Sequence, residues 1–90
     1  IGGGPVNNPP TASFTYSCTP ARVCTFTSTS TDSDGTVVGW KWTNPSGAVT
    51  ISTAATWTRT FGVARTFNLK LTVTDNGGAT GVVTQSVTVP

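Results

Sequence analysis

The sequence contains no histidine and only three acidic residues, so most enzyme chemistry has no residues to carry it out. Nucleophilic catalysis by serine or cysteine usually relies on an imidazole base, and none is present. Catalysis by paired carboxylates would have to use Asp32, Asp34 or Asp75, which lie in segments rich in turn-forming residues. No cofactor-binding motif is present either. We therefore expect that the chain is not an enzyme and requires no cofactor.

Charge and long apolar runs are also scarce. The net charge is +2, and the five basic residues are scattered along the chain: Arg22, Lys41, Arg59, Arg65 and Lys70. A protein that holds a phosphate backbone gathers its cations into a patch or stripe, so we expect no nucleic-acid partner. No apolar run approaches the roughly 20 residues that a helix needs to cross a bilayer, so we expect no membrane partner.

The chain has two cysteines, Cys18 and Cys24, which enclose five residues that include Pro20. Without histidine or further cysteines they cannot complete a four-ligand zinc site. The spacing suits a disulfide across a turn, which would contribute about 2 kcal/mol in the chain-entropy model. The alternative is two free thiols. A disulfide predicts a secreted, extracellular protein.

β-Branched residues are abundant, with 20 threonines and 11 valines, and such side chains favour strands. Alternation of apolar and polar residues between turn signals predicts strands at residues 12–16, 23–28, 36–43, 48–52, 56–61, 66–74 and 81–89. No helix is expected. The pattern predicts an all-β fold, namely an immunoglobulin-like antiparallel β-sandwich of about seven strands.

The parity of the apolar residues indicates which side chains form the core. The inward face of the most regular strand carries Phe67, Leu69, Leu71 and Val73. In the third predicted strand, Val38, Trp40 and Trp42 share a parity and are expected to face inward. In the fifth, Arg59 falls on the same parity as Trp57, which an edge position or a β-bulge would explain.

The first ten residues have the composition of a linker, because a glycine run is followed by the stiffer sequence Asn-Asn-Pro-Pro. We therefore divide the chain into a linker at 1–10 and one β-sandwich domain at 11–90, since ninety residues leave no room for a second. The chain opens with Ile1 rather than methionine, and we expect a neighbouring domain before it.

Three segments occur in the order seen in PKD domains, the bacterial relatives of the polycystic-kidney-disease repeat. They are Pro-Pro-Thr-Ala-Ser-Phe at 9–14, Ser-Thr-Asp-Ser-Asp-Gly-Thr-Val at 30–37, and Leu-Thr-Val-Thr-Asp-Asn-Gly-Gly at 71–78. The resemblance covers about residues 9–89. The chain departs from the family pattern at 43–47, where Thr-Asn-Pro-Ser-Gly replaces an acidic Asp-Phe-Gly-Asp-Gly run. It departs again at 59–61, where Arg-Thr-Phe stands for His-Thr-Tyr.

The resemblance implies a non-catalytic accessory module of a secreted bacterial hydrolase of the protease, collagenase or chitinase type, in the first place a protease. Such a module shares its chain with a catalytic domain and assists binding to an insoluble protein or polysaccharide, such as collagen or chitin. The alternative is a structural spacer between domains. In either case we expect a monomer.

The acidic residues favour a metal site over catalysis. In an immunoglobulin-like topology the second-to-third loop, the last hairpin and the N-terminus share one end of the sandwich. Asp32, Asp34 and Asp75 would then lie near Asn7 and Asn8. Calcium takes oxygen ligands from carboxylates, amides and carbonyls, so these five residues predict a calcium site that could fix the orientation of the linker. The alternative is that they are ordinary turn formers.

Four residues are candidates for contact with a substrate: Trp57, Trp40, Lys41 and Lys70. Trp57 lies in an irregular segment that an edge position would expose, whereas Trp40 belongs to the core or is partly exposed near a strand end. Lys41 and Lys70 would face solvent on neighbouring strands and form a small positive patch. The alternatives are packing in the core for the tryptophans and ordinary solvation for the lysines.

Overall fold

The computed structural model describes residues 7–90, which form seven strands and no helix. The strands are β1 (Phe14–Cys18), β2 (Val23–Ser28), β3 (Val37–Thr43), β4 (Thr50–Ser52), β5 (Thr56–Thr60), β6 (Arg65–Asp75) and β7 (Thr80–Val89). Within this part of the chain there is accordingly no helix long and apolar enough to span a bilayer. The predicted ranges agree with these bounds to within two residues at either end.

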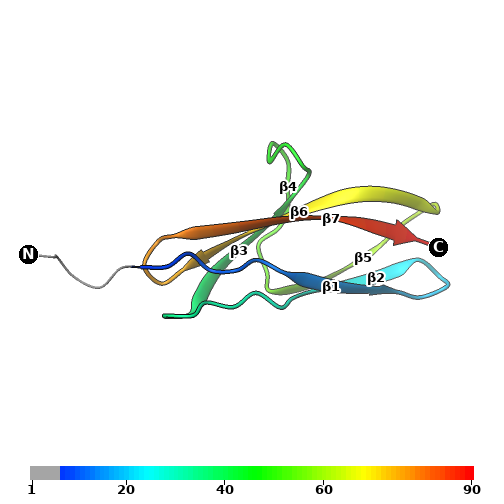
Figure 1. Ribbon diagram of the computed structural model, residues 1–90. Helices are drawn as coiled ribbons and strands as arrows, with labels where there is room; N and C mark the ends of the chain where they lie inside the picture. The colour runs from blue at the N-terminus through cyan, green and yellow to red at the C-terminus, as the bar shows by residue number, and fades with distance from the viewer. Residues whose placement is uncertain (1–6) are drawn as a thin grey trace, which may run out of the picture.

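The strands form two sheets that pack face to face (Figure 1). One sheet has the order β1-β2-β5 and the other the order β4-β3-β6-β7, and every pairing is antiparallel. The longest ladder joins β6 to β7, in register from Arg65 opposite Val89 to Thr74 opposite Thr80. The predicted seven-stranded antiparallel sandwich is therefore confirmed.

The core lies between the sheets. Its buried hydrophobic residues are Phe14, Cys24, Phe26, Trp42, Phe61, Leu69, Leu71, Val73, Val87 and Val89. Trp42 is fully buried, and its indole N–H donates a hydrogen bond of 2.7 Å to the carbonyl oxygen of Ala54. The ring of Phe14 meets that of Trp42 edge-on, with centroids 5.0 Å apart. A buried tryptophan needs an acceptor for its N–H, and here the backbone before β5 supplies it.

The prediction for Val38 was wrong, because this side chain is 57% exposed. The register of β3 against β6 shifts between Val37 and Gly39. Such a β-bulge inserts one extra residue and restarts the alternation of faces. Residues after the bulge keep their predicted parity, so Trp42 and Trp40 face the core while Lys41 faces solvent.

Arg59 lies on the same face of β5 as the inward-facing Trp57. The fold tolerates a charged residue there because β5 is the edge strand of its sheet. At an edge the two sheets do not cover each other, so a charged side chain can start on the inner face and still reach solvent. Arg59 is exposed, and its guanidinium carbon lies 5.2 Å from the centroid of the Phe61 ring. The edge position, one of two predicted explanations, accounts for the arginine.

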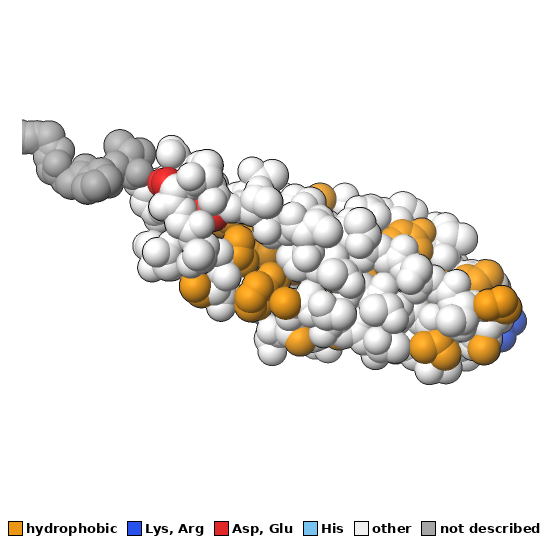
Figure 2. All heavy atoms as spheres, turned by 90° about the horizontal axis from the view of Figure 1, so that it is seen from below, with side chains coloured by type: hydrophobic (Ala, Val, Ile, Leu, Met, Phe, Trp, Pro, Cys, Tyr) orange, Lys and Arg blue, Asp and Glu red, His pale blue; other side chains and the backbone are white. Residues whose placement is uncertain are grey.

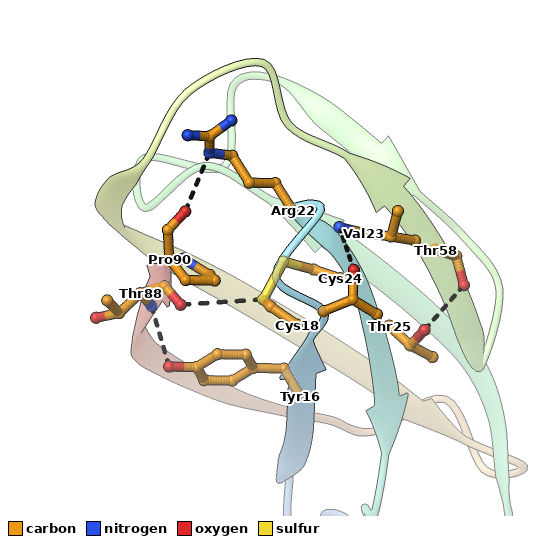
Figure 3. Close-up of a disulfide and its surroundings, with 10 residues drawn as sticks. Tyr16, Cys18, Arg22, Val23, Cys24, Thr25, Thr58, Thr88 and Pro90 are labelled. Carbon is orange, nitrogen blue, oxygen red and sulfur yellow. Dashed lines mark hydrogen bonds between the residues drawn. A yellow bond between two sulfur atoms is a disulfide. The ribbon is translucent and has the colours of Figure 1, made fainter.

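Cys18 and Cys24 lie opposite each other at the end of the β1–β2 ladder and form the predicted disulfide (Figure 3). The sulfur of Cys18 also lies 3.9 Å from the carbonyl oxygen of Thr88. A disulfide sulfur carries no proton, so this is a packing contact and not a hydrogen bond. The link between the sheets comes instead from Tyr16 on β1, whose hydroxyl oxygen accepts a hydrogen bond of 3.0 Å from the Thr88 N–H.

We call the end of the sandwich with the disulfide the arginine pole, because Arg22, Arg59 and Arg65 all lie there. Arg22 is in the turn between β1 and β2, and its Nε donates to the carbonyl oxygen of Pro90 at 3.0 Å (Figure 3). Arg65 begins β6, and its guanidinium carbon lies 5.0 Å from the centroid of the Phe67 ring. The C-terminal end of the described chain thus lies at this pole.

Candidate cation site, binding surfaces and relatives

The opposite end of the sandwich, which we call the acidic pole, holds Asp32, Asp34 and Asp75. Asp75 is the last residue of β6, and the other two lie in the loop between β2 and β3. One carboxylate oxygen of each residue lies within 4.8 Å of one carboxylate oxygen of each of the other two. Figure 2 shows the acidic atoms at one end of the molecule and a group of basic atoms at the other. The structure thus brings together the three carboxylates that the topology rule placed at one end.

Asp75 is held in place by its backbone neighbours. It is 1% exposed, and its Oδ1 accepts hydrogen bonds from the N–H groups of Ala79 at 2.8 Å and Gly77 at 2.9 Å and from the side-chain amide of Asn7 at 3.3 Å. Burial raises the pKa of this carboxyl, but the hydrogen bonds together outweigh it and hold the pKa below its usual value. Asp75 is therefore ionised at neutral pH, and its Oδ2 is buried without a partner.

The pKa of Asp32 is shifted in the opposite direction. Burial, followed by the adjacent Asp34, raises its pKa above the usual value, because both disfavour another negative charge at this place. Both carboxylate oxygens of Asp32 are buried without a hydrogen-bond partner. Buried polar atoms in folded proteins are rarely left unpaired. The acidic pole therefore presents unpaired oxygens and concentrated negative charge.

The end of the predicted linker packs against this pole. The N–H of Asn8 donates a hydrogen bond of 2.7 Å to Oδ2 of Asp34, next to the contact between Asn7 and Asp75. Pro10 is buried, and its carbonyl group lies so close to Gly81 that a side chain at that position would collide with it. Of the predicted linker 1–10, residues 1–6 lie outside the described residues, whereas residues 7–10 lie against the domain.

The donor set fits a calcium ion. Calcium is a hard cation that binds six to eight oxygen atoms, mostly from carboxylates, amide carbonyls and water. Asp32, Asp34 and Asp75 offer carboxylate oxygens at the required proximity, and the side chain of Asn7 lies beside Asp75. Asn8 differs from the prediction in the atom it offers, because its contact with Asp34 is through a backbone N–H. An N–H positions the carboxylate but cannot bind the ion.

The four residues predicted to touch a substrate do not share one surface. Trp40 and Trp57 are half-buried and pack against the core from different sheets. Lys41 and Lys70 lie on the outer face of the β3–β6 pair, where the register places Lys41 opposite Thr72 and Lys70 opposite Thr43. The two lysines are thus diagonal neighbours, a spacing of roughly 7–8 Å between Cα atoms.

A groove that sequence reasoning missed lies between the sheets near the arginine pole. It has a volume of about 310 Å³, and its lining includes Ile51, Trp57, Arg59, Phe61, Arg65 and Phe67. Trp57 stacks on Phe26 with centroids 4.3 Å apart, so one face of the indole is covered by the core. The sequence signal for this groove is the parity of Arg59, which places a cation among inward-facing aromatic residues.

The chain matches no model of a protein family, and no curated protein sequence matches it significantly. Solved structures do match. The PKD1 domain of Vibrio anguillarum Epp is 28% identical, with a TM-score of 0.79 over 93% of this chain and 96% of that one.

Two further structures are more similar in sequence. A structure of carbohydrate-binding modules from the β-sandwich superfamily, described as having promiscuous specificity, is 34% identical with a TM-score of 0.74. The match covers 94% of this chain but 36% of that one. The PKD1 domain of the Vibrio cholerae metalloprotease PrtV is 32% identical with a TM-score of 0.75, over 91% of this chain and 98% of that domain. Identity at this level over a whole domain, with the same sandwich, shows that the chain belongs to the PKD domain family.

Proposed function

We propose that this accessory module uses a calcium ion at the acidic pole to fix the direction in which the preceding chain enters the domain. The observation that carries the proposal is the set of buried carboxylate oxygens without partners, both of Asp32 and Oδ2 of Asp75. In the same cluster, Asp75 contacts the side chain of Asn7 and Asp34 contacts the backbone N–H of Asn8. A cation there would act on the fold and on the entering chain together.

Calcium would supply positive charge and shared coordination where the chain itself has neither. Asp32, Asp34 and Asp75 would hold the ion, with the side-chain oxygen of Asn7 as a fourth donor. Because the N–H of Asn8 already orients Asp34, binding would also restrict the backbone at the domain boundary. Extracellular calcium modules typically bind with dissociation constants of about 10⁻⁴–10⁻³ M, which suits a secreted protein with a disulfide.

Thermal unfolding tests the proposal. At calcium concentrations tenfold above Kd, the free energy of unfolding should rise by about 1.4 kcal/mol, which is several degrees in Tm for a domain of this size. Asp32→Asn should abolish the rise, while Ser33→Ala, a change in the same loop without a carboxylate, should preserve it. Slower hydrogen exchange at the Asn8 amide in calcium would link the ion to the entering chain. An equal rise in Tm for Asp32→Asn would disprove the role of this cluster.

A second candidate function is attachment to insoluble polymer, and the similarity to carbohydrate-binding modules favours it. The contact surface would be Lys41 and Lys70 on the outer face of β3 and β6 or, for an insoluble protein such as collagen, the groove beside Trp57. It would hold a neighbouring catalytic domain near its substrate.

Sedimentation with insoluble collagen, chitin and cellulose tests this second candidate. The Lys41→Gln/Lys70→Gln double variant removes the outer cations, and Trp57→Phe alters the groove while keeping an aromatic ring. We expect one of the two to reduce the bound fraction. Full recovery of the unaltered domain in all three supernatants would eliminate the attachment function and leave the orienting function intact.

A further inference from the structure

The groove near the arginine pole combines an apolar floor with two cations. Phe61 and Phe67 lie side by side, with ring centroids 5.5 Å apart. A guanidinium group lies over each ring, that of Arg59 over Phe61 and that of Arg65 over Phe67. Stacking on an aromatic ring occupies the face of a guanidinium and leaves its N–H groups at the edge free to donate.

No acidic side chain lies near the two cations. The sequence has three acidic residues, and all of them lie at the acidic pole. Arg65 and Asp75 are the two ends of β6, and ten steps at about 3.3 Å put them roughly 33 Å apart, well beyond the Debye length of about 8 Å at physiological salt. The guanidinium groups are therefore available to an anion from outside the chain.

The groove adjoins a free strand edge. β5 pairs with β2 on one side, and on its other side it has no strand partner among residues 7–90. Trp57 and Arg59, which line the groove, are both residues of β5. An exposed edge offers backbone N–H and C=O groups that an extended polypeptide can pair with.

We propose that this groove binds the C-terminal end of an extended polypeptide. The terminal carboxylate would accept hydrogen bonds from Arg59 and Arg65, and arginine matches the planar shape of a carboxylate with paired donors. The apolar side chain of the last residue would lie between Ile51 and Phe67, and the backbone before it would pair with the edge of β5. A C-terminal residue carries carboxylate and side chain on one Cα atom, which fits a groove of about 310 Å³.

The same contacts disfavour a polysaccharide. A sugar ring packs its flat face on an exposed aromatic face, but one face of each phenylalanine ring lies under a guanidinium group and one face of Trp57 is covered by Phe26. A sugar chain also cannot extend a β-sheet. This inference goes beyond the calcium function and does not depend on it.

The test is a titration of the ¹⁵N-labelled domain followed by NMR. The probe is a hexapeptide of alternating threonine and valine that ends in phenylalanine with a free carboxylate. The comparison probes are the same peptide with a C-terminal amide, the amide with aspartate as the fifth residue, and an oligogalacturonate of similar length. We expect shifts at residues 56–60 with the acid, and binding at least fivefold weaker with the amide and with the internal aspartate.

Protein variants give a second comparison. Arg59→Gln/Arg65→Gln should weaken binding of the free acid at least fivefold, whereas Lys41→Gln, which also removes positive charge from an exposed strand position, should leave it unchanged. Retained amide spectra would show that each variant is folded. The proposal is overturned if acid and amide bind equally, if the double variant binds like the original, or if oligogalacturonate alone shifts the groove residues. Shifts with none of the probes at millimolar concentration would also overturn it.

Discussion

At the acidic pole three carboxylates lie together with oxygens that have no partner, whereas at the arginine pole each arginine has a contact of its own. Arg22 contacts Pro90, Arg59 lies over Phe61, and Arg65 lies over Phe67. One pole is also closed covalently by the disulfide. The difference suggests that the stability of the acidic pole depends on solution conditions, while that of the arginine pole is built into the chain.

Removing the disulfide is the strongest challenge to the arginine pole. In Cys18→Ala/Cys24→Ala the unfolded chain regains the freedom of a short loop, so the free energy of unfolding should fall by about 2 kcal/mol, or roughly 10 °C in Tm. Differential scanning calorimetry measures the change. The rise in Tm with calcium should persist in this variant. If it is lost as well, the two poles are not independent.

The pH dependence of stability tests the acidic pole without calcium. The pKa of Asp32 is raised. The free energy of unfolding should therefore decline as pH rises from the ordinary value of 3.8 through the raised value, because the folded state then holds a negative charge that burial and Asp34 disfavour. Asp75 has a lowered pKa, so its contribution is present above 3.8 and lost as pH falls through the lowered value. Maximum stability should therefore lie in mild acid.

Thermal melts from pH 3 to pH 7 in the presence of a chelator measure this profile. Asp32→Asn removes the group responsible for the decline toward neutral pH, so its curve should stay level there. Calcium should have the same levelling effect on the unaltered domain, since a cation favours the ionised form. A profile that rises steadily to neutral pH without calcium would contradict the raised pKa of Asp32.

Tyr16→Phe separates the hydrogen bond between the sheets from the disulfide beside it. Thr88 lies on β7, an edge strand, and its N–H would lose the hydroxyl oxygen of Tyr16 but could turn to water. The expected loss is about 0.5–1 kcal/mol in the free energy of unfolding. Urea denaturation measures it, and faster exchange should appear at the Thr88 amide. Unchanged exchange there would show that the bond does not form in solution.

Arg59→Ala should reduce stability no more than Tyr16→Phe does. An exposed cation–π contact contributes about 0.5–1 kcal/mol, and no ion pair is lost with it. Added salt should change the stability of this variant and of the original equally. A loss well above 1 kcal/mol would mean that the arginine supports the fold and is not simply available in the groove.

The sequence predicted much of the fold because its signals are local. Period-two alternation and turn residues locate all seven strands, and the parity that Trp42 shares with Trp40 places it on the inward face. The gathering of Asp32, Asp34 and Asp75 could be predicted as well, because it follows from which loops share an end of this topology.

Features that depend on cross-strand geometry could not be predicted in the same way. The exposure of Val38 results from a bulge in the register between β3 and β6, which alternation within one strand does not reveal. The groove depends on how side chains from both sheets meet at an edge, and the stacking of Arg59 and Arg65 depends on rotamers. The separation of Trp40 from Lys41 follows from strand parity, but that of both from Trp57 required the assignment of strands to sheets.

The described residues begin at one pole, where Asn7 contacts Asp75, and reach the other at Pro90, which contacts Arg22. Tension applied between these two points would run along the strands and load the ladder hydrogen bonds in shear, many at once, which is the direction in which a sheet resists best. The hydrogen bonds of Asn7 and Asn8 would be the first to carry the load. Filling the acidic pole with a divalent ion would then raise the force at which the domain begins to open.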